Sequence, residues 1–197
     1  MTIELRADLQ AIADLIQPSE KVLDLGCGDG SLLRHLIDSK HITGRGVEIA
    51  EAKVLACVRN GITVRQGDLH EELRDYPDRS FNTVILSYTI PYLNDPASII
   101  KGMLRVGQRA VVSFPNWGHW RSRLNLLLTG HMPNVPGDDE PWYASPRARP
   151  LTIGDFTEFC KQHTIRITDQ IYLQGAHRVP ARFDTNLRAT PAIFELK

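Results

Sequence analysis

VLDLGCGDGSLLRHL, residues 22–36, joins a short apolar run to three closely spaced glycines and then to a helical pattern. The run contains an acid, Asp24, and Gly26, Gly28 and Gly30 follow it at every second position. A short apolar run bounded by turn signals is typical of a buried strand. Glycines between a strand and a helix permit positive φ and let a ligand approach the backbone closely. The stretch therefore predicts a strand, a ligand-binding turn and a helix in direct succession.

Strands and helices alternate along the first 114 residues. Apolar runs predict strands at residues 21–25, 43–49, 62–66, 81–86 and 108–114. Helical spacing predicts helices at residues 5–16, 31–37, 50–59 and 97–104. This alternation indicates a parallel sheet with helices on both faces, joined by right-handed crossovers. The expected fold class is α/β, with a doubly wound, mostly parallel seven-stranded sheet and an antiparallel C-terminal strand.

The alternation ends after residue 114. A helix is expected over residues 117–128, followed by an excursion at 131–150 that holds five of the twelve prolines. Such a proline content excludes a helix or a central strand there. A chain of 197 residues is most economically one domain. We therefore expect a single domain over residues 1–197 with a proline-rich excursion.

The C-terminal part predicts one more helix and two more strands. Thr152 and Asp155 resemble a capping box, which opens a helix that reaches about His163. Pro191 falls inside the last expected strand and indicates an edge or irregular strand. The two strands are expected at residues 164–173 and 189–196.

Charge and cysteine usage limit the compartment and the partners. Twenty-three acids balance twenty-three lysines and arginines, so overall charge gives no case for nucleic acid or an anionic membrane surface. Cys27, Cys57 and Cys160 form no C-x-x-C pair, which favours free thiols in a reducing compartment over a disulfide scaffold or a zinc site. The N-terminus lacks the apolar core of a secretion signal, and no apolar run approaches the roughly 18 residues of a membrane span. We therefore expect a cytoplasmic protein without a nucleic-acid or membrane partner.

The glycine turn has two candidate ligands. The dinucleotide pattern is G-x-G-x-x-G, but Gly30 falls one position early and Ser31 takes the expected place of the third glycine. Asp24 is unfavourable beside a phosphate, whereas it suits a ligand with a positive sulfonium and an ammonium group. S-adenosylmethionine is such a ligand. The D-x-G-x-G-x-G pattern of residues 24–30 resembles the first motif of class I methyltransferases.

Two further acids stand at the ends of the next two expected strands. Glu48 follows Gly26 by 22 residues, and an acid there can accept hydrogen bonds from both ribose hydroxyls. Asp68 follows Glu48 by 20 residues and can accept from the adenine amino group, with the Leu69 N–H donating to the ring. Either acid alone fits a helix cap equally well, but the set of three beside a glycine turn favours a nucleoside site. The residues expected to bind the cofactor are Asp24, Gly26, Cys27, Gly28, Glu48, Ile49, Gly67, Asp68, Leu69 and Ser87.

The sequence identifies no catalytic residue. Residues 87–93, SYTIPYL, lack the acid or amide of the D/N-P-P-Y loop of amine methyltransferases. Ser87 and Tyr88 can line the methionine end of the pocket or serve as ordinary packing residues. Cys27 is favoured as a packing residue over a nucleophile, because no nearby cation lowers its pKa. No His/Cys cluster predicts a metal site, and no G-x-S-x-G elbow predicts an esterase.

Residues 113–124, SFPNWGHWRSRL, bring two tryptophans and two arginines together beyond the fifth expected strand. Trp and Arg are enriched at protein interfaces, and Trp142 and Tyr143 extend the same surface. The alternative is that the tryptophans anchor a long connection onto the core, since Trp is mostly buried in either case.

Taken together, four segments of the chain resemble the MetW family of methionine-biosynthesis proteins. They are VLDLGCGDGSLL, the Gly-Val-Glu of residues 46–48, the Gln-Gly-Asp-Leu of residues 66–69, and SFPNWGHWRSRL with the later MP…P-WY segment. The resemblance covers almost the whole chain and implies a Rossmann-like class I methyltransferase fold. It also implies a role in forming acylated homoserine, together with a homoserine O-acyltransferase of the α/β-hydrolase type. Ile90-Pro91 departs from the Leu-Gln-like pair expected after the fourth strand, on the acceptor side of the pocket.

Two functions fit these features. The first is an accessory protein that binds S-adenosylmethionine or S-adenosylhomocysteine and acts on the acyltransferase through Trp117–Arg123 and Trp142–Tyr143. It is favoured by a complete nucleoside-site pattern without acceptor chemistry, and by the 20 residues before the first strand, too few for a lid. The alternative is an active S-adenosylmethionine-dependent small-molecule methyltransferase of unknown acceptor, with residues 131–150 as its lid. A nicotinamide-dependent enzyme is disfavoured by the misplaced third glycine.

Overall fold

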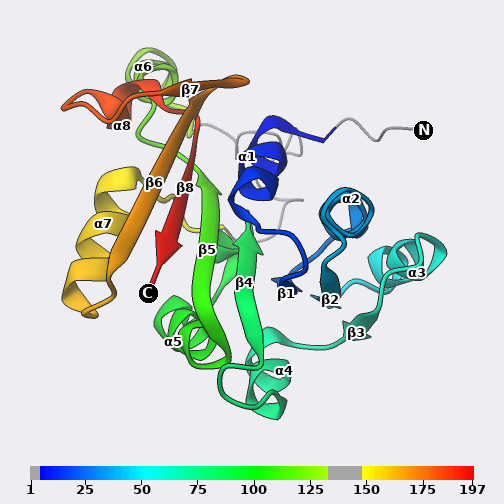
Figure 1. Ribbon diagram of the computed structural model, residues 1–197. Coiled ribbons are helices and arrows are strands. Elements are labelled where there is room, and N and C mark those ends of the chain that lie inside the picture. The colour runs from blue at the N-terminus through cyan, green and yellow to red at the C-terminus, as the bar shows by residue number, and fades with distance from the viewer. Residues whose placement is uncertain (1–4, 133–147) are drawn as a thin grey trace.

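An eight-stranded sheet with helices on both faces runs through the computed structural model, which describes residues 5–132 and 148–197 (Figure 1). Its strands are β1 (Lys21–Leu25), β2 (Thr43–Glu48), β3 (Val64–Gln66), β4 (Phe81–Ser87), β5 (Gly107–Pro115), β6 (Ile167–Gln174), β7 (His177–Val179) and β8 (Pro191–Leu196). Its helices are α1 (Ala7–Leu15), α2 (Ser31–Lys40), α3 (Glu51–Arg59), α4 (Leu69–Asp75), the 3-10 helix η1 (Ile90–Tyr92), α5 (Pro96–Val106), α6 (Trp120–Thr129), α7 (Ile153–Gln162) and α8 (Thr185–Arg188). No helix within these described ranges is long and apolar enough to cross a membrane.

The strand order confirms the doubly wound α/β fold expected from the sequence. The order is β3-β2-β1-β4-β5-β8-β6-β7, and the first five strands are parallel. The chain moves outward from β1 to β3 and then returns to place β4 on the other side of β1. The switch point therefore lies between β1 and β4, and ligands of such sheets bind beyond the carboxyl ends of the strands at that point.

The C-terminal strands are antiparallel, as expected, but their arrangement differs from the prediction in two ways. A short hairpin around Gly175, whose φ is +61°, adds β7 to the predicted seven strands. β8 lies inside the sheet between β5 and β6, so of the two alternatives expected from Pro191 the edge strand was wrong, whereas the pairing of β8 with β6 does contain an irregularity, between Ile167 and Asp169. Pro191 is the first residue of β8 and lies opposite Pro115, the last residue of β5. A proline is tolerated in an interior strand at such an end position, where no further ladder hydrogen bond is required of it.

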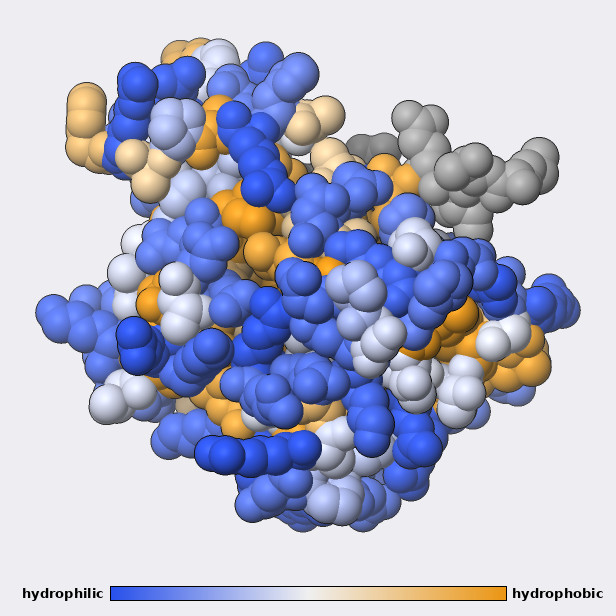
Figure 2. Space-filling model, viewed as in Figure 1, coloured by the Kyte–Doolittle hydropathy of each residue, from blue (hydrophilic) through white to orange (hydrophobic). Residues whose placement is uncertain are grey.

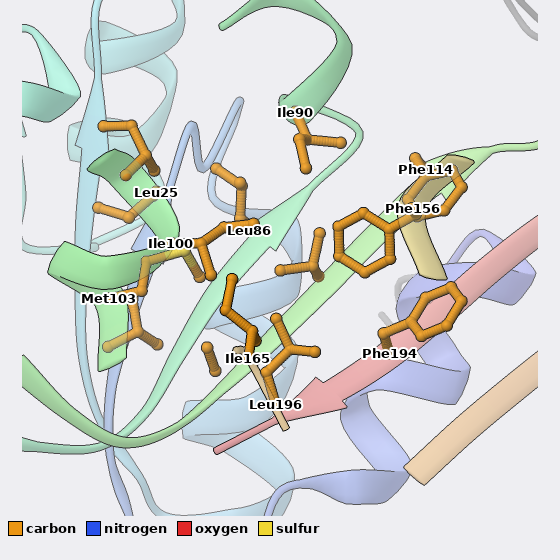
Figure 3. Packing of buried hydrophobic residues seen from close by; sticks show 14 of the residues in the cluster. Leu25, Leu86, Ile90, Ile100, Met103, Phe114, Phe156, Ile165, Phe194 and Leu196 are labelled. Carbon is orange, nitrogen blue, oxygen red and sulfur yellow. The ribbon is translucent and has the colours of Figure 1, made fainter. Parts of the chain in front are cut away.

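Two hydrophobic clusters fill the two faces of the sheet. In β5, Ala110 and Val112 pack in the cluster beneath α4, α5 and α7, whereas Val111 packs in the cluster beneath α1, α2 and α3. Figure 3 shows the first cluster, in which Phe156 of α7 lies 5.0 Å from Phe114 and 4.8 Å from Phe194 between ring centroids. Because both faces are covered, the strands read as continuous apolar runs in the sequence.

A mostly buried arginine of β5 connects the C-terminal end of α1 to the sheet. Arg109 donates to Glu20 at 3.0 Å, to Glu195 at 2.6 Å and to the Leu15 carbonyl oxygen at 2.8 Å. Its Nε also donates to the Thr83 hydroxyl of β4 at 2.8 Å. One cation between two carboxylates satisfies these buried groups, as buried charges require. The contacts hold the end of α1 against the sheet, and the beginning of α1 borders the cleft described next.

Candidate functional site

A cleft of about 960 Å³ lies beyond the carboxyl ends of β1, β2, β3 and β4. This volume is in the range of sites for small molecules and cofactors. The structure brings all ten residues expected from the sequence together around it. They are Asp24, Gly26, Cys27, Gly28, Glu48, Ile49, Gly67, Asp68, Leu69 and Ser87.

The glycine turn forms one wall of the cleft, and two of its glycines are required for different reasons. Gly26 has a φ of +72°, and a Cβ there would lie 2.5 Å from the Thr89 hydroxyl of the loop after β4. Gly28 has a φ of +60°, but a Cβ there would meet no protein atom within 4 Å. Gly26 therefore permits the glycine turn to pack closely against the loop after β4. At Gly28, in contrast, the absence of a side chain leaves the backbone accessible to a ligand.

Glu48 connects the end of β2 to this turn. Its carboxylate is buried; one oxygen accepts from the Gly28 N–H at 2.9 Å, and the other accepts from the Ile49 and Ala50 N–H groups at 3.0 Å each. A carboxylate offers about four lone-pair sites, so three backbone donors leave it acceptor capacity. The helix-cap interpretation and the ligand interpretation of this acid are compatible.

Asp68 is exposed at the start of α4 and acts as its N-cap. One carboxylate oxygen accepts from the His70 N–H at 2.8 Å. The cap interpretation weighed from the sequence therefore describes part of what Asp68 does. Leu69, the first residue of α4, keeps its N–H outside the hydrogen bonds of the helix itself.

Asp24 is the unusual group of the cleft. It is only 3 % exposed, and its Oδ1 is buried without a hydrogen-bond partner. Burial, and secondly the negative charge of Glu48, raise the pKa of Asp24 to about 7. An acid buried without a partner destabilises a fold, and strongly shifted acids in clefts are typical of functional sites. The geometry provides a place for a positively charged group.

The wall formed by α1 was not anticipated. Leu5, Arg6 and Leu9 line the cleft, so the N-terminal segment contributes more to it than the sequence suggested. The Arg6 guanidinium binds the buried Asp8 carboxylate at 2.6 and 2.8 Å and lies 4.4 Å from the centre of the Tyr88 ring. The apolar spacing over residues 5–16 indicated only a helix facing the core, and it contained no signal for a polar group beside a ligand.

Tyr88 also lines the cleft, and its position at a methionine end of the site stays a prediction. Its φ is +54°, which is uncommon for a residue other than glycine. Its N–H donates to the Ser113 carbonyl oxygen at 2.9 Å. Burial, followed by the charge of Asp8, holds the pKa of the Tyr88 phenol above its usual range.

Two cysteines meet behind the glycine turn although they are distant in sequence. The Sγ atoms of Cys27 and Cys57 are 3.7 Å apart, and the Cys57 thiol donates to the Gly28 carbonyl oxygen at 3.2 Å. Burial raises the pKa of both thiols. For Cys27 the negative charge of Asp24 acts in the same direction as burial, so this thiol has the environment of a packing residue and not of a nucleophile.

The Trp- and Arg-containing segment divides into a buried part and an exposed part. Trp117 is 9 % exposed and its N–H donates to the Leu151 carbonyl oxygen at 3.0 Å, so it anchors the connection to the core. Trp120 is 45 % exposed at the start of α6. Trp142 and Tyr143, the other half of the expected surface, lie outside the described residues.

The class of protein follows from the fold. A structure of an S-adenosylmethionine-dependent methyltransferase from Archaeoglobus fulgidus superimposes with a TM-score of 0.71 at 17% identity, over 97% of this chain and 91% of that chain. A possible histamine N-methyltransferase from Thermotoga maritima gives a TM-score of 0.68 at 15% identity, over 97% and 87%. The chain therefore has the Rossmann-like fold of S-adenosylmethionine-dependent methyltransferases.

The chain belongs to the MetW family, because the family model described as methionine biosynthesis protein MetW matches residues 6–196. The bifunctional methionine biosynthesis protein MetXA/MetW of Rhodopirellula baltica is 32% identical over 202 residues, which cover 97% of this chain. The chain spans about one third, 32%, of the length of that relative. It is thus a methyltransferase-like protein of methionine biosynthesis.

The environment of Asp24 predicts that Asp24→Asn stabilises the protein in a pH-dependent way. The folded state raises the pKa of Asp24 from 3.8 to about 7, so the natural protein loses stability as pH rises through that interval, whereas the neutral amide does not. Urea denaturation should show the variant more stable by a few kcal/mol at about pH 8 and nearly equal at about pH 4. Asp68→Asn is the matched control at an exposed acid. A constant difference between natural protein and Asp24→Asn at both pH values contradicts the prediction.

Proposed function

We propose that the cleft binds S-adenosylmethionine or S-adenosylhomocysteine, and that the protein acts with a homoserine O-acyltransferase in the formation of acylated homoserine. The observation that carries the ligand assignment is the buried, unpartnered Asp24 carboxylate beside a turn whose backbone is open at Gly28. Both ligands carry an ammonium group, and the first also carries a sulfonium. A phosphate-containing ligand is disfavoured by the same carboxylate.

Each part of the nucleoside has a group of suitable chemistry in the cleft. Glu48 retains acceptor capacity for ribose hydroxyls after binding three backbone N–H groups. Asp68, which lines the same cleft, would accept from the adenine amino group, and the Leu69 N–H would donate to a ring nitrogen. Arg6 lies at the α1 wall and offers a cation for the carboxylate of the amino-acid part. Asp24 would pair with the positive charges of that same part.

The partnership with an acyltransferase is supported by a relative in which two regions form one polypeptide. In the R. baltica protein, a region similar to this whole chain is joined in one polypeptide to a region named MetXA. Joining two proteins in one chain raises their effective concentration for each other. Proteins that are joined in one chain commonly work together, and the family itself is named for methionine biosynthesis.

An active methyltransferase is the second candidate. The volume of about 960 Å³ lies near the upper end of the range of roughly 300–1,000 Å³ for single-ligand sites and leaves space for an acceptor beside the nucleoside. Incubation with methyl-labelled S-adenosylmethionine and a metabolite extract distinguishes the candidates. Incorporation of label into a small molecule would favour this second function.

Gly28→Val should abolish binding of S-adenosylhomocysteine, because the new side chain would project into the open space of the cleft. Gly175→Val is the matched control: Gly175 has nearly the same φ, +61°, and equally free surroundings, but it lies in the hairpin between β6 and β7. Both variants bear the same backbone strain, of about 1–2 kcal/mol. Isothermal titration should find binding only in the control, and normal affinity in Gly28→Val would place the ligand elsewhere.

The affinity for S-adenosylhomocysteine should fall as pH is lowered from about 8 to about 6. The Asp24 carboxyl, whose pKa is raised to about 7, must lose its proton to pair with the ammonium group. Affinity therefore decreases by up to roughly tenfold per pH unit below that pKa. In Asp24→Asn the dependence should be lost, and 5′-methylthioadenosine, which lacks the charged amino-acid part, should show none with either protein. Equal pH dependence for both ligands would remove Asp24 from the binding mechanism.

The partnership is tested by measuring homoserine acylation by the purified acyltransferase with and without this protein. A change in rate that saturates at equal concentrations of the two proteins is expected, because a stoichiometric complex is proposed. An unchanged rate together with the absence of a complex in size-exclusion chromatography would rule the partnership out. Neither result depends on whether the cleft binds its ligand.

A further inference from the structure

Helix α6 has the sequence pattern of a buried helix but lies in solvent. Trp120, Leu124, Leu127 and Leu128, here called the α6 stripe, occupy positions i, i+4, i+7 and i+8, which place them on one face of a helix. In a globular protein such a stripe faces the core. Here its members are 45, 42, 80 and 72 % exposed, and no residue of α6 is buried. An apolar face of this kind marks an interaction site.

The base of α6 is held rigidly by the buried side chain of Asn116. Its amide nitrogen donates to the Asn186 and Ala189 carbonyl oxygens at 2.9 Å each. Its amide oxygen accepts from the N–H groups of Gly118 at 3.0 Å and Ile153 at 3.3 Å. All four hydrogen-bonding positions of the amide are thus used on backbone from three separate segments. The exposed helix therefore leaves the sheet from a fixed point.

Two further contacts fix the first turn of α6. The His119 Nδ1 accepts from the Arg121 N–H at 3.3 Å and caps the helix. The Arg123 guanidinium donates back to the Gly118 carbonyl oxygen at 2.7 Å. Order at the base of an apolar, solvent-exposed helix reduces the entropy lost when a partner binds it.

Helix α8 lies near the base of α6 and also exposes apolar side chains. The Asn116 contact to Asn186 connects the base of α6 to α8, and the two helices project together with β7 from one end of the sheet (Figure 1). Phe183, just before α8, is fully exposed, and Leu187 of α8 is 40 % exposed. In Figure 2 the visible face of this projection is mostly hydrophilic, with a few hydrophobic residues scattered on it.

We infer that the α6 stripe is the surface on which the homoserine O-acyltransferase docks. The inference rests on the proposed partnership. The occupant is assigned to the acyltransferase for two reasons. A relative of this whole chain carries the MetXA region in the same polypeptide, and permanent complexes bury more hydrophobic surface than transient ones.

The charge of the helix is an additional reason. α6, WRSRLNLLLT, contains Arg121 and Arg123 but no acid. A second copy of this helix would therefore offer no carboxylate to these arginines. The surface instead fits an apolar groove bordered by carboxylates, since complementary charges specify a partner and raise its association rate.

The test compares Leu127→Glu/Leu128→Glu with the matched control Leu55→Glu/Val58→Glu. The control residues are 50 and 60 % exposed on α3, so both variants place two acids on an exposed apolar helix face. Affinity for the purified acyltransferase, measured by titration calorimetry, should fall by roughly 100-fold or more in the α6 variant, because interface centres dominate affinity. The control should stay within about threefold of the natural protein. Binding of S-adenosylhomocysteine should be unchanged in the α6 variant, which shows that it is folded.

Each other outcome has one meaning. If the α6 variant binds the acyltransferase as the natural protein does, the docking surface is wrong while the partnership stands. If the natural protein forms no complex, the partnership fails and the inference fails with it. If light scattering shows a dimer of the natural protein that the α6 variant does not form, the stripe is covered by a second copy, and the assignment to the acyltransferase is overturned.

Discussion

The Glu48 carboxylate is the contact on which the geometry of the cleft depends. It accepts hydrogen bonds from two segments: from the Gly28 N–H in the turn after β1, and from the Ile49 and Ala50 N–H groups directly after β2. The Gly26 and Cys27 N–H groups add to this connection by donating to the Val47 carbonyl oxygen at 2.8 and 3.1 Å. The glycine turn is therefore held in its shape by hydrogen bonds within the protein, and sites held in this way lose less free energy on binding.

The same contact explains why two neighbouring buried acids differ. Glu48 accepts three backbone hydrogen bonds, whereas Asp24 has no partner for Oδ1 and lies near the negative charge of Glu48. Hydrogen bonds to a carboxylate favour its charged form, and burial and like charges disfavour it. Glu48 therefore shapes the cleft, whereas Asp24 is available to interact with a bound ligand. Burying Asp24 without a partner destabilises the folded state, and proteins commonly keep such destabilising residues at functional sites.

The sequence predicted the parts of the fold and site that depend on local patterns. Buried strands such as β1 and β5 are continuous apolar runs, and strand-end acids such as Glu48 fall at one edge of a parallel sheet by topology alone. α4 was missed because LHEELRD is short and charged, with too few apolar positions for a periodic signal. The prediction of β8 as an edge strand was wrong because a proline at the end of a strand does not reveal which strands pair with it.

Contacts between distant segments could not be predicted in the same way. The apolar spacing of α1 indicated which face is buried, but not that Arg6 would bend over Tyr88 of the loop after β4. α6 is the opposite case, because it carries an apolar stripe and yet none of its residues is buried by the described part of the chain. Periodicity specifies that a face needs a partner; the partner itself is a property of the tertiary or quaternary structure.

The carboxyl end of β5 joins the cleft to the α6 stripe. On one side, Ser113 accepts from the Tyr88 N–H through its carbonyl oxygen at 2.9 Å and donates from its hydroxyl to Ser87 at 3.0 Å. On the other side, three residues along the chain, Asn116 holds the base of α6 and donates from its N–H to the Thr190 carbonyl oxygen at 2.7 Å. Hydrogen bonds at one strand end therefore connect Tyr88, which lines the cleft, with the residue that holds the base of α6. The cleft and the α6 stripe are thus built on the same structural element, the carboxyl end of the last parallel strand of the sheet.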